Sequence, residues 1–127
     1  RNLRNELKKS RKIYFTDCGI RNYVIGDWRP LENRSPDEIG RLWENYLVGE
    51  RRKLNESKRT FARGYFWRTT AQSEIDYVEE VDGRITAFEF KWNAKQSSTK
   101  CPLTFVSAYP NAQFVVITPE NIYDFLK

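Results

Sequence analysis

Histidine is absent from this 127-residue sequence, and so is methionine. Without histidine the chain cannot build a Ser-His-Asp or Cys-His catalytic centre, and histidine-ligated zinc is excluded as well. Any catalysis must therefore use carboxylates, lysine, arginine, tyrosine or a hard metal ion bound through oxygen. Because methionine is missing at position 1 as elsewhere, we expect a fragment of a longer protein.

Cysteine is scarce as well, with Cys18 and Cys101 far apart in the chain. Their spacing matches neither a zinc site nor a redox pair. We therefore expect buried free thiols in a reducing compartment and a cytoplasmic protein. No apolar run approaches the roughly 18 to 20 residues of a membrane span, and no signal peptide is visible, so no membrane partner is expected.

The composition that is present suits one domain over residues 1–127, with residues 1–11 as a linker. Apolar residues make up 39% and aromatic residues 15%, which is enough for one core. The net charge of +5 suits a polyanionic partner such as DNA. Basic residues crowd two segments, 1–12 and 51–63, each of which is either a solvated surface or a phosphate contact.

Helical and strand periodicities predict a mixed α/β order. Ser35 as N-cap, Pro36 at the first position and Glu38 three residues after the cap form a capping box, so a helix begins there. The Asp82-Gly83 pair predicts a tight hairpin. The predicted elements are a strand at 12–17, helices from 17 to about 26 and from 36 to about 55, strands at 61–68, 74–80 and 84–92, a helix at 102–109, a central strand at 113–118 buried on both faces, and a helix at 120–126.

Charged residues interrupt the two strands of this hairpin near one end. Alternation puts Glu89 and Lys91 on one face, and Ile75 and Tyr77 on the face opposite Asp76. Counting outward from the turn places Asp76 across from Glu89. Two facing carboxylates repel unless a cation lies between them, which suits Mg²⁺. The alternative is an ordinary surface hairpin with a Glu-Lys pair.

Two further acidic residues lie on the long predicted helix. Glu44 lies on the flank of its apolar stripe, where it either reaches the edge of the sheet or faces solvent. Glu50 falls within the stripe itself, which predicts an internal salt bridge because a buried carboxylate needs a cation or hydrogen-bond donors.

In combination these motifs resemble the PD-(D/E)XK nuclease superfamily. The segments that carry the resemblance are Gly40-x-x-Trp43-Glu44-x-x-x-Val48, Ile75-Asp76-Tyr77-Val78 and Phe88-Glu89-Phe90-Lys91. More closely, the chain resembles the C-terminal domain of unknown function that follows an AAA+ type ATPase module in many bacterial and archaeal proteins. The resemblance covers nearly the whole chain. It implies a restriction endonuclease-like αβββαβ core, with a mixed central sheet flanked by helices.

The same resemblance implies roles for individual residues. Asp76, Glu89 and the backbone carbonyl of Phe90 would bind Mg²⁺ or Mn²⁺, Lys91 would activate the attacking water, and Glu44 would hold a metal water or a second ion. Candidate phosphate or nucleic-acid contacts are Gln72, Ser73, Arg68 and Arg21. Trp67 and Trp92 are expected in the core.

Two departures from the family pattern matter. Its usual Pro-Asp is here Ile75-Asp76, which keeps the aspartate, and no G-x-x-x-x-G-K-[ST] nucleotide-binding motif occurs, so ATP would bind only to an upstream module. Three functions remain open. They are a Mg²⁺-dependent DNA endonuclease, an inactive nuclease-fold module that binds DNA or protein, and a structural or oligomerising domain built on the aromatic content.

Overall fold

The structure is a computed structural model, and it describes residues 22, 26–71 and 73–127. The elements in chain order are η1 (Leu31–Asn33), α3 (Pro36–Ser57), β1 (Arg63–Arg68), β2 (Glu74–Val81), β3 (Arg84–Phe90), η2 (Ala94–Gln96), α4 (Leu103–Ala108), β4 (Gln113–Ile117) and α5 (Ile122–Phe125). The predicted strand at 12–17, most of the helix predicted up to residue 26, and Cys18 lie outside the described residues. Among the described residues, no helix is both long enough and apolar enough to cross a membrane.

The long helix α3 begins as its capping residues predict. The Ser35 hydroxyl accepts a hydrogen bond from the Glu38 backbone N–H, and the Glu38 carboxylate accepts one from the Ser35 N–H. Pro36 follows at the first position, where its missing N–H costs nothing. Reciprocal capping therefore fixes the start of the helix that later supplies Glu44.

The four described strands form one mixed sheet in the order β1-β2-β3-β4. β1, β2 and β3 are antiparallel, and β4 runs parallel to β3. Asp82 and Gly83 both have positive φ, as the predicted tight turn requires. β4 was expected at the centre of the sheet, but among the described strands it lies at the edge. Its apolar run has another cause, because Phe114 packs toward one face of the sheet and Val115 toward the other.

A β-bulge interrupts β2 at Asp76 and Tyr77. Tyr65 pairs with Val78 and Trp67 pairs with Ile75, so two residues of β2 lie opposite the single residue between them on β1. The extra residue changes the alternation of side chains. The expectation that Ile75 and Tyr77 share a face is therefore wrong, since each belongs to a different core cluster.

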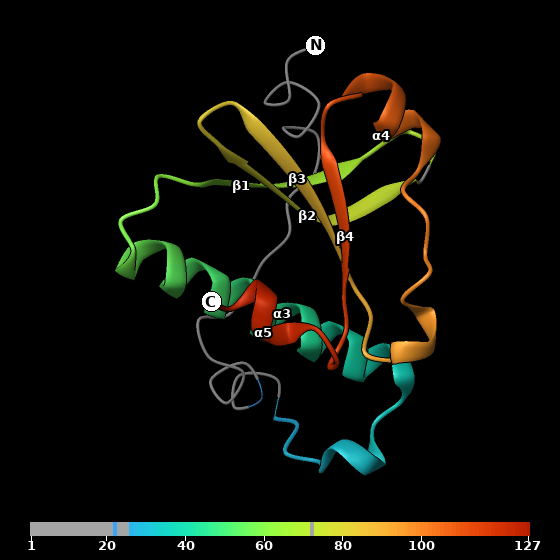
Figure 1. The fold of residues 1–127 in the computed structure, drawn as a ribbon. Helices are drawn as coiled ribbons and strands as arrows, with labels where there is room; N and C mark the ends of the chain where they lie inside the picture. The colour runs from blue at the N-terminus through green and yellow to red at the C-terminus, as the bar shows by residue number, and fades with distance from the viewer. Residues whose placement is uncertain (1–21, 23–25, 72) are drawn as a thin grey trace.

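Each face of the sheet carries its own apolar cluster. One joins the sheet to α4 and comprises Trp67, Ile75, Val78, Ala87, Phe105 and Tyr109. The other joins it to α3 and α5 and comprises Trp43, Leu47, Phe88, Phe90, Ile117 and Phe125. Figure 1 shows α3 and α5 side by side, with α4 near the opposite end of the sheet. The result is a layered α/β domain.

A buried ion pair ties α3 to the sheet and to α5. The Arg51 guanidinium donates to both carboxylate oxygens of Glu79, over 3.0 and 2.9 Å, and also to the Phe125 carbonyl. Asn55 and the Tyr77 hydroxyl add hydrogen bonds to Glu79. Burial opposes ionisation of Glu79, but these donors outweigh it, so its pKa lies below the usual value. The internal salt bridge expected for Glu50 is not found, because Glu50 pairs with Lys53 within α3 itself, where both side chains are partly exposed.

We predict that Arg51→Met destabilises the fold by about 3 kcal/mol, because it leaves the Glu79 carboxylate buried without its cation. Urea denaturation measures the change. Adding Glu79→Gln to that variant removes the orphaned charge and should restore at least half of the loss. A loss below about 1 kcal/mol in the single variant would show that Glu79 is adequately solvated without Arg51.

Gly64 has a steric role beside the bulge. A Cβ at this position would lie 2.8 Å from Cε1 of Tyr77. The Tyr77 ring cannot easily move, since its hydroxyl bonds Glu79 and its ring stacks on Phe88 and Phe90.

We predict that Gly64→Ala lowers the free energy of unfolding by about 1–3 kcal/mol through overpacking. Gly40→Ala is the matched control, because no atom lies within 4 Å of a Cβ placed there. Thermal melts of the two variants compare them directly. Equal melting temperatures would mean that the Tyr77 ring moves aside without a loss of stability.

Candidate functional site

The bulged end of the β2–β3 hairpin brings the two predicted carboxylates together. Tyr77 pairs with Phe88 and Val81 with Arg84, which is the register obtained by counting outward from the turn. At the next position the Asp76 N–H donates to Oε1 of Glu89 over 3.1 Å. The Phe90 N–H in turn donates to Oδ2 of Asp76 over 2.9 Å. Each carboxylate is thus held by the backbone of the opposite strand.

The bulge explains why side chains replace the regular ladder here. The β2–β3 backbone pairing is regular from the turn to Tyr77 and Phe88. Beyond it, carboxylate oxygens satisfy backbone N–H groups that would otherwise be left unpaired. The Phe90 N–H donates toward β2, and the Lys91 N–H donates to the Ile117 carbonyl of β4. Successive backbone N–H groups therefore still point to opposite neighbours at this end of β3. The Phe90 carbonyl therefore also faces β2, toward Asp76.

Burial and a neighbouring negative charge perturb the ionisation of Glu89. This residue is only 9% exposed. Burial, followed by the negative charge of Asp76, raises the pKa of Glu89 to about 7. The Lys91 ammonium lies 3.8 Å from Oε2 of Glu89 and acts in the opposite direction. This ammonium only partly compensates the acidic pair, which is the environment that a bound cation would relieve.

An open cavity of about 490 Å³ lies over this end of the hairpin. Asp76, Phe90 and Lys91 line it from the sheet, and Glu44 lines it from α3. The helix also contributes Arg41, one turn before Glu44. Glu44 was expected either at the sheet or in solvent, and it lies on the same cavity as Asp76 and Lys91.

The arrangement does not form a preassembled multidentate metal site. Among residues 22, 26–71 and 73–127, no group of three or more Asp, Glu, Cys or His side chains is positioned to hold a metal ion. A cation at this position would have Asp76, Glu89 and the Phe90 carbonyl as its protein ligands. Mg²⁺ is usually bound by one or two carboxylates and keeps several waters, so this donor set suits it.

The predicted phosphate contacts lie apart from this cavity or outside the described residues. The Arg68 guanidinium pairs with Glu74 across the β1–β2 hairpin, with Nε 3.4 Å from the carboxylate. Ser73 is held in the turn, where its N–H donates to the Thr69 hydroxyl. Arg21 and Gln72 lie outside the described residues.

Several cavity residues were missed by the sequence reasoning. Arg41 precedes Glu44 by three residues, so helical periodicity alone could have found it. Asn93 and Gln96 come from the loop after β3, whose path no local pattern predicts. Trp67 is buried, as expected, but Trp92 is 44% exposed and lines the cavity. The expected core position of Trp92 is wrong, because β3 ends at Phe90 and the strand alternation ends with it.

Comparison with known proteins gives two matching relatives. They are the uncharacterized protein Rv2008c of Mycobacterium tuberculosis (strain ATCC 25618 / H37Rv) and the uncharacterized protein Mb2031c of Mycobacterium bovis (strain ATCC BAA-935 / AF2122/97). Each is 26% identical to this chain over 119 residues, a match that covers 93% of the chain and 26% of the relative. The chain thus spans about a quarter of the length of these relatives.

No solved structure matches the chain significantly. Residues 39–127 match a family whose description is "Domain of unknown function (DUF4143)". The match begins in the first turns of α3 and runs to residue 127. It therefore includes Arg41, Glu44, Asp76, Phe90 and Lys91 of the acidic cavity. On this match, which covers more than half of its length, the chain belongs to the DUF4143 family.

Proposed function

We propose that this domain is a Mg²⁺- or Mn²⁺-dependent phosphodiesterase that cleaves DNA. The observation that carries the proposal is the Asp76–Glu89 pair, locked by reciprocal backbone hydrogen bonds at the strand ends. Lys91 lies beside Glu89, and Glu44 lines the same cavity as Asp76 and Lys91. Carboxylates with an adjacent ammonium are the groups that metal-assisted phosphodiester hydrolysis requires.

The order of elements supports a restriction endonuclease-like fold of the PD-(D/E)XK type. A long helix precedes three antiparallel strands, and a short helix and a parallel strand follow them. This is the αβββαβ order implied by the sequence resemblance. The carboxylates come from the second and third strands, as that resemblance implies.

The donor set is consistent with a hard divalent cation. Asp76, Glu89 and the Phe90 carbonyl would hold it. Burial and the Asp76 charge raise the pKa of Glu89, and a bound cation would act against both. A metal ion bound at such a position lowers the pKa of water and neutralises phosphate charge. Glu89 must lose its proton to bind the ion, so metal binding and protonation compete.

The remaining side chains have separate tasks. The Lys91 ammonium favours the negative charge that develops on a phosphate during hydrolysis. Glu44 accepts hydrogen bonds from water in the cavity and so orients it. Arg41 lines the same cavity and provides a second cation for the phosphate backbone.

An inactive module that binds DNA or protein is the second candidate function. It is favoured by the absence, among the described residues, of a three-ligand metal group. In that case the hydrogen bonds from backbone N–H groups to the Asp76 and Glu89 carboxylates serve only to hold the ends of β2 and β3 together. DNA binding that depends on salt but not on a divalent metal would support this alternative.

We further propose, from the sequence resemblance, that the domain belongs to a longer cytoplasmic protein with an AAA+ type ATPase module preceding it. The matching mycobacterial proteins are about four times as long as the matched segment, which leaves room for such a module. ATP would then act through that module, and the nuclease domain would take its DNA from it.

We predict that the chain nicks plasmid DNA when Mg²⁺ or Mn²⁺ is added and that Asp76→Asn abolishes cleavage. Asparagine keeps the oxygen that accepts the Phe90 N–H but loses the charge, so the fold is retained while the ligand is lost. Lys91→Ala should slow cleavage by about 10²–10³-fold. Conversion of supercoiled to open-circular DNA on a gel measures both effects.

Glu80→Gln is the matched control, since it removes a carboxylate from the same strand at a residue outside the cavity. It should cleave like the wild type. Cleavage by Asp76→Asn at the wild-type rate would reject the nuclease proposal, because it would identify the activity as a contaminant or place it elsewhere.

We predict that Mg²⁺ raises the melting temperature at about pH 8 and has little effect at about pH 5.5, because a proton competes for Glu89. Without metal, the folded protein binds the Glu89 proton more tightly than the unfolded chain does. This contribution to stability is fully present below the ordinary glutamate pKa and is lost as the pH rises through about 7. Glu89→Gln should therefore be more stable than wild type at pH 8, by about 2 kcal/mol.

Calorimetry and thermal melts at the two pH values test this prediction. The glutamine variant should also lose the response to Mg²⁺ while keeping its bond to the Asp76 N–H. A variant that still binds Mg²⁺ as tightly as the wild type would exclude Glu89 as a ligand.

A further inference from the structure

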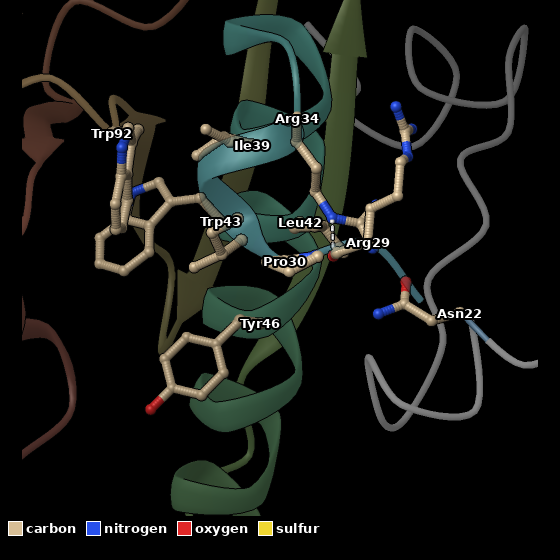
Figure 2. Close-up of a pocket in the computed structure, with 10 residues that line it drawn as sticks. Asn22, Arg29, Pro30, Arg34, Ile39, Leu42, Trp43, Tyr46 and Trp92 are labelled. Atoms are coloured by element: carbon tan, nitrogen blue, oxygen red, sulfur yellow. Dashed lines mark hydrogen bonds between the residues drawn. The ribbon is translucent and has the colours of Figure 1, made fainter. Parts of the chain in front are cut away.

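A second cavity, of about 410 Å³, lies beside the first and is walled largely by aromatic and aliphatic side chains. Trp43 and Tyr46 of α3 line it together with Trp92 from the loop after β3. Figure 2 shows these three rings gathered along α3. Tyr46 is 43% exposed and Trp92 44%, so both present ring surface to solvent.

The aromatic rings already contact one another in a defined geometry. The rings of Trp43 and Tyr46 are nearly parallel, with centroids 6.3 Å apart and an interplanar angle of 24°. Trp92 meets Trp43 edge to face, with centroids 5.2 Å apart. Trp43 is thus fixed in the core, and the other two rings flank it as a platform.

Among the described residues, the cations that line this cavity, Arg29 and Arg34, are already neutralised. The Arg29 guanidinium contacts both Asp27 and Glu38, over 2.8 and 3.0 Å, and Arg34 contacts Asp27 over 3.0 Å. The cavity therefore offers ring faces and aliphatic surface rather than free positive charge. A neutral planar group suits it better than a phosphate.

One polar atom of the cavity wall has no partner. The indole Nε1 of Trp43 is buried and makes no hydrogen bond to any residue that the structure describes. In Figure 2 this nitrogen lies on the side of Trp92. A buried donor without an acceptor is unfavourable.

Trp92 lines both cavities, so the aromatic cavity adjoins the one that Asp76 and Lys91 line. On α3 the residues at 36, 37, 40, 41 and 44 face the acidic cavity, and those at 39, 42, 43 and 46 face the aromatic one. A polymer with alternating charged and planar groups could thus place a charged group in the acidic cavity and a planar group in the aromatic cavity, with Trp92 between them.

We infer that the aromatic cavity is a nucleobase-binding subsite, which takes an unpaired base from a nucleic acid whose phosphate lies in the acidic cavity. This inference rests on the proposed function and specifies its substrate as single-stranded or locally unpaired nucleic acid. A base within a duplex keeps its faces stacked on its neighbours and cannot enter. Stacking on aromatic side chains is tolerant of base identity.

Binding to short fluorescent oligonucleotides tests the inference, in EDTA and at fixed salt so that no cleavage occurs. A single strand and a duplex with one unpaired flap should bind the 127-residue chain more tightly than a blunt duplex, by about tenfold. Tyr46→Ala and Trp92→Ala should each weaken single-strand binding by about tenfold and leave duplex binding unchanged. Trp92→Phe retains a ring face and should restore most of the affinity.

Tyr123→Ala is the matched control, because this aromatic residue is also exposed but belongs to α5 and does not line the cavity. It should bind every oligonucleotide like the wild type. Equal affinity for single strand and duplex, or unchanged affinity in both alanine variants, overturns the inference. The second result would indicate that another part of the chain, or a second copy, fills the cavity.

The two proposals can fail separately. Without metal, the binding assay does not depend on Asp76 or Glu89 as metal ligands. Ring-dependent binding with no cleavage in Mg²⁺ would retain the base subsite and reject the nuclease. Cleavage with ring-independent binding would retain the nuclease and reject the subsite.

Discussion

The reciprocal hydrogen bonds between Asp76 and the backbone of β3, and between Glu89 and the backbone of β2, are the constraint on which the site depends. They hold two acidic side chains close together at a place where the regular sheet ladder stops. Burial of Glu89, followed by repulsion from Asp76, is the accompanying cost, and the two together raise the pKa of Glu89. The backbone donors keep the pair in place despite that cost, so the geometry does not require an ion to assemble it.

A second buried carboxylate, that of Glu79, is neutralised by a cation. Glu79 lies two residues beyond the bulge and is almost fully covered, yet Arg51 contacts both of its oxygens and its pKa is lowered. Glu89 has only a lysine, 3.8 Å away. The same strand pair therefore contains one neutralised carboxylate that fixes α3 and one undercompensated carboxylate beside the cavity. Perturbed groups of the second kind are the ones typical of functional sites.

Much of the fold could be predicted from local chemistry. The capping box at Ser35, the Asp82-Gly83 turn and the register that joins Asp76 to Glu89 each depend on a few neighbouring residues, and the structure agrees with all three. The bulge could not be predicted, because it shows only in the pairing of β1 with β2. The edge position of β4 and the exposure of Trp92 likewise depend on long-range packing rather than on periodicity.

The hairpin of β2 and β3 has a consequence for the order of assembly. Its two strands are joined by a two-residue turn, so closing it requires little loop entropy. The parallel pairing of β3 with β4 must instead bridge the segment that contains α4, and α3 must dock from further upstream. We therefore expect the acidic pair to come together early in folding and the cavity above it to close late, since local contacts form before distant ones.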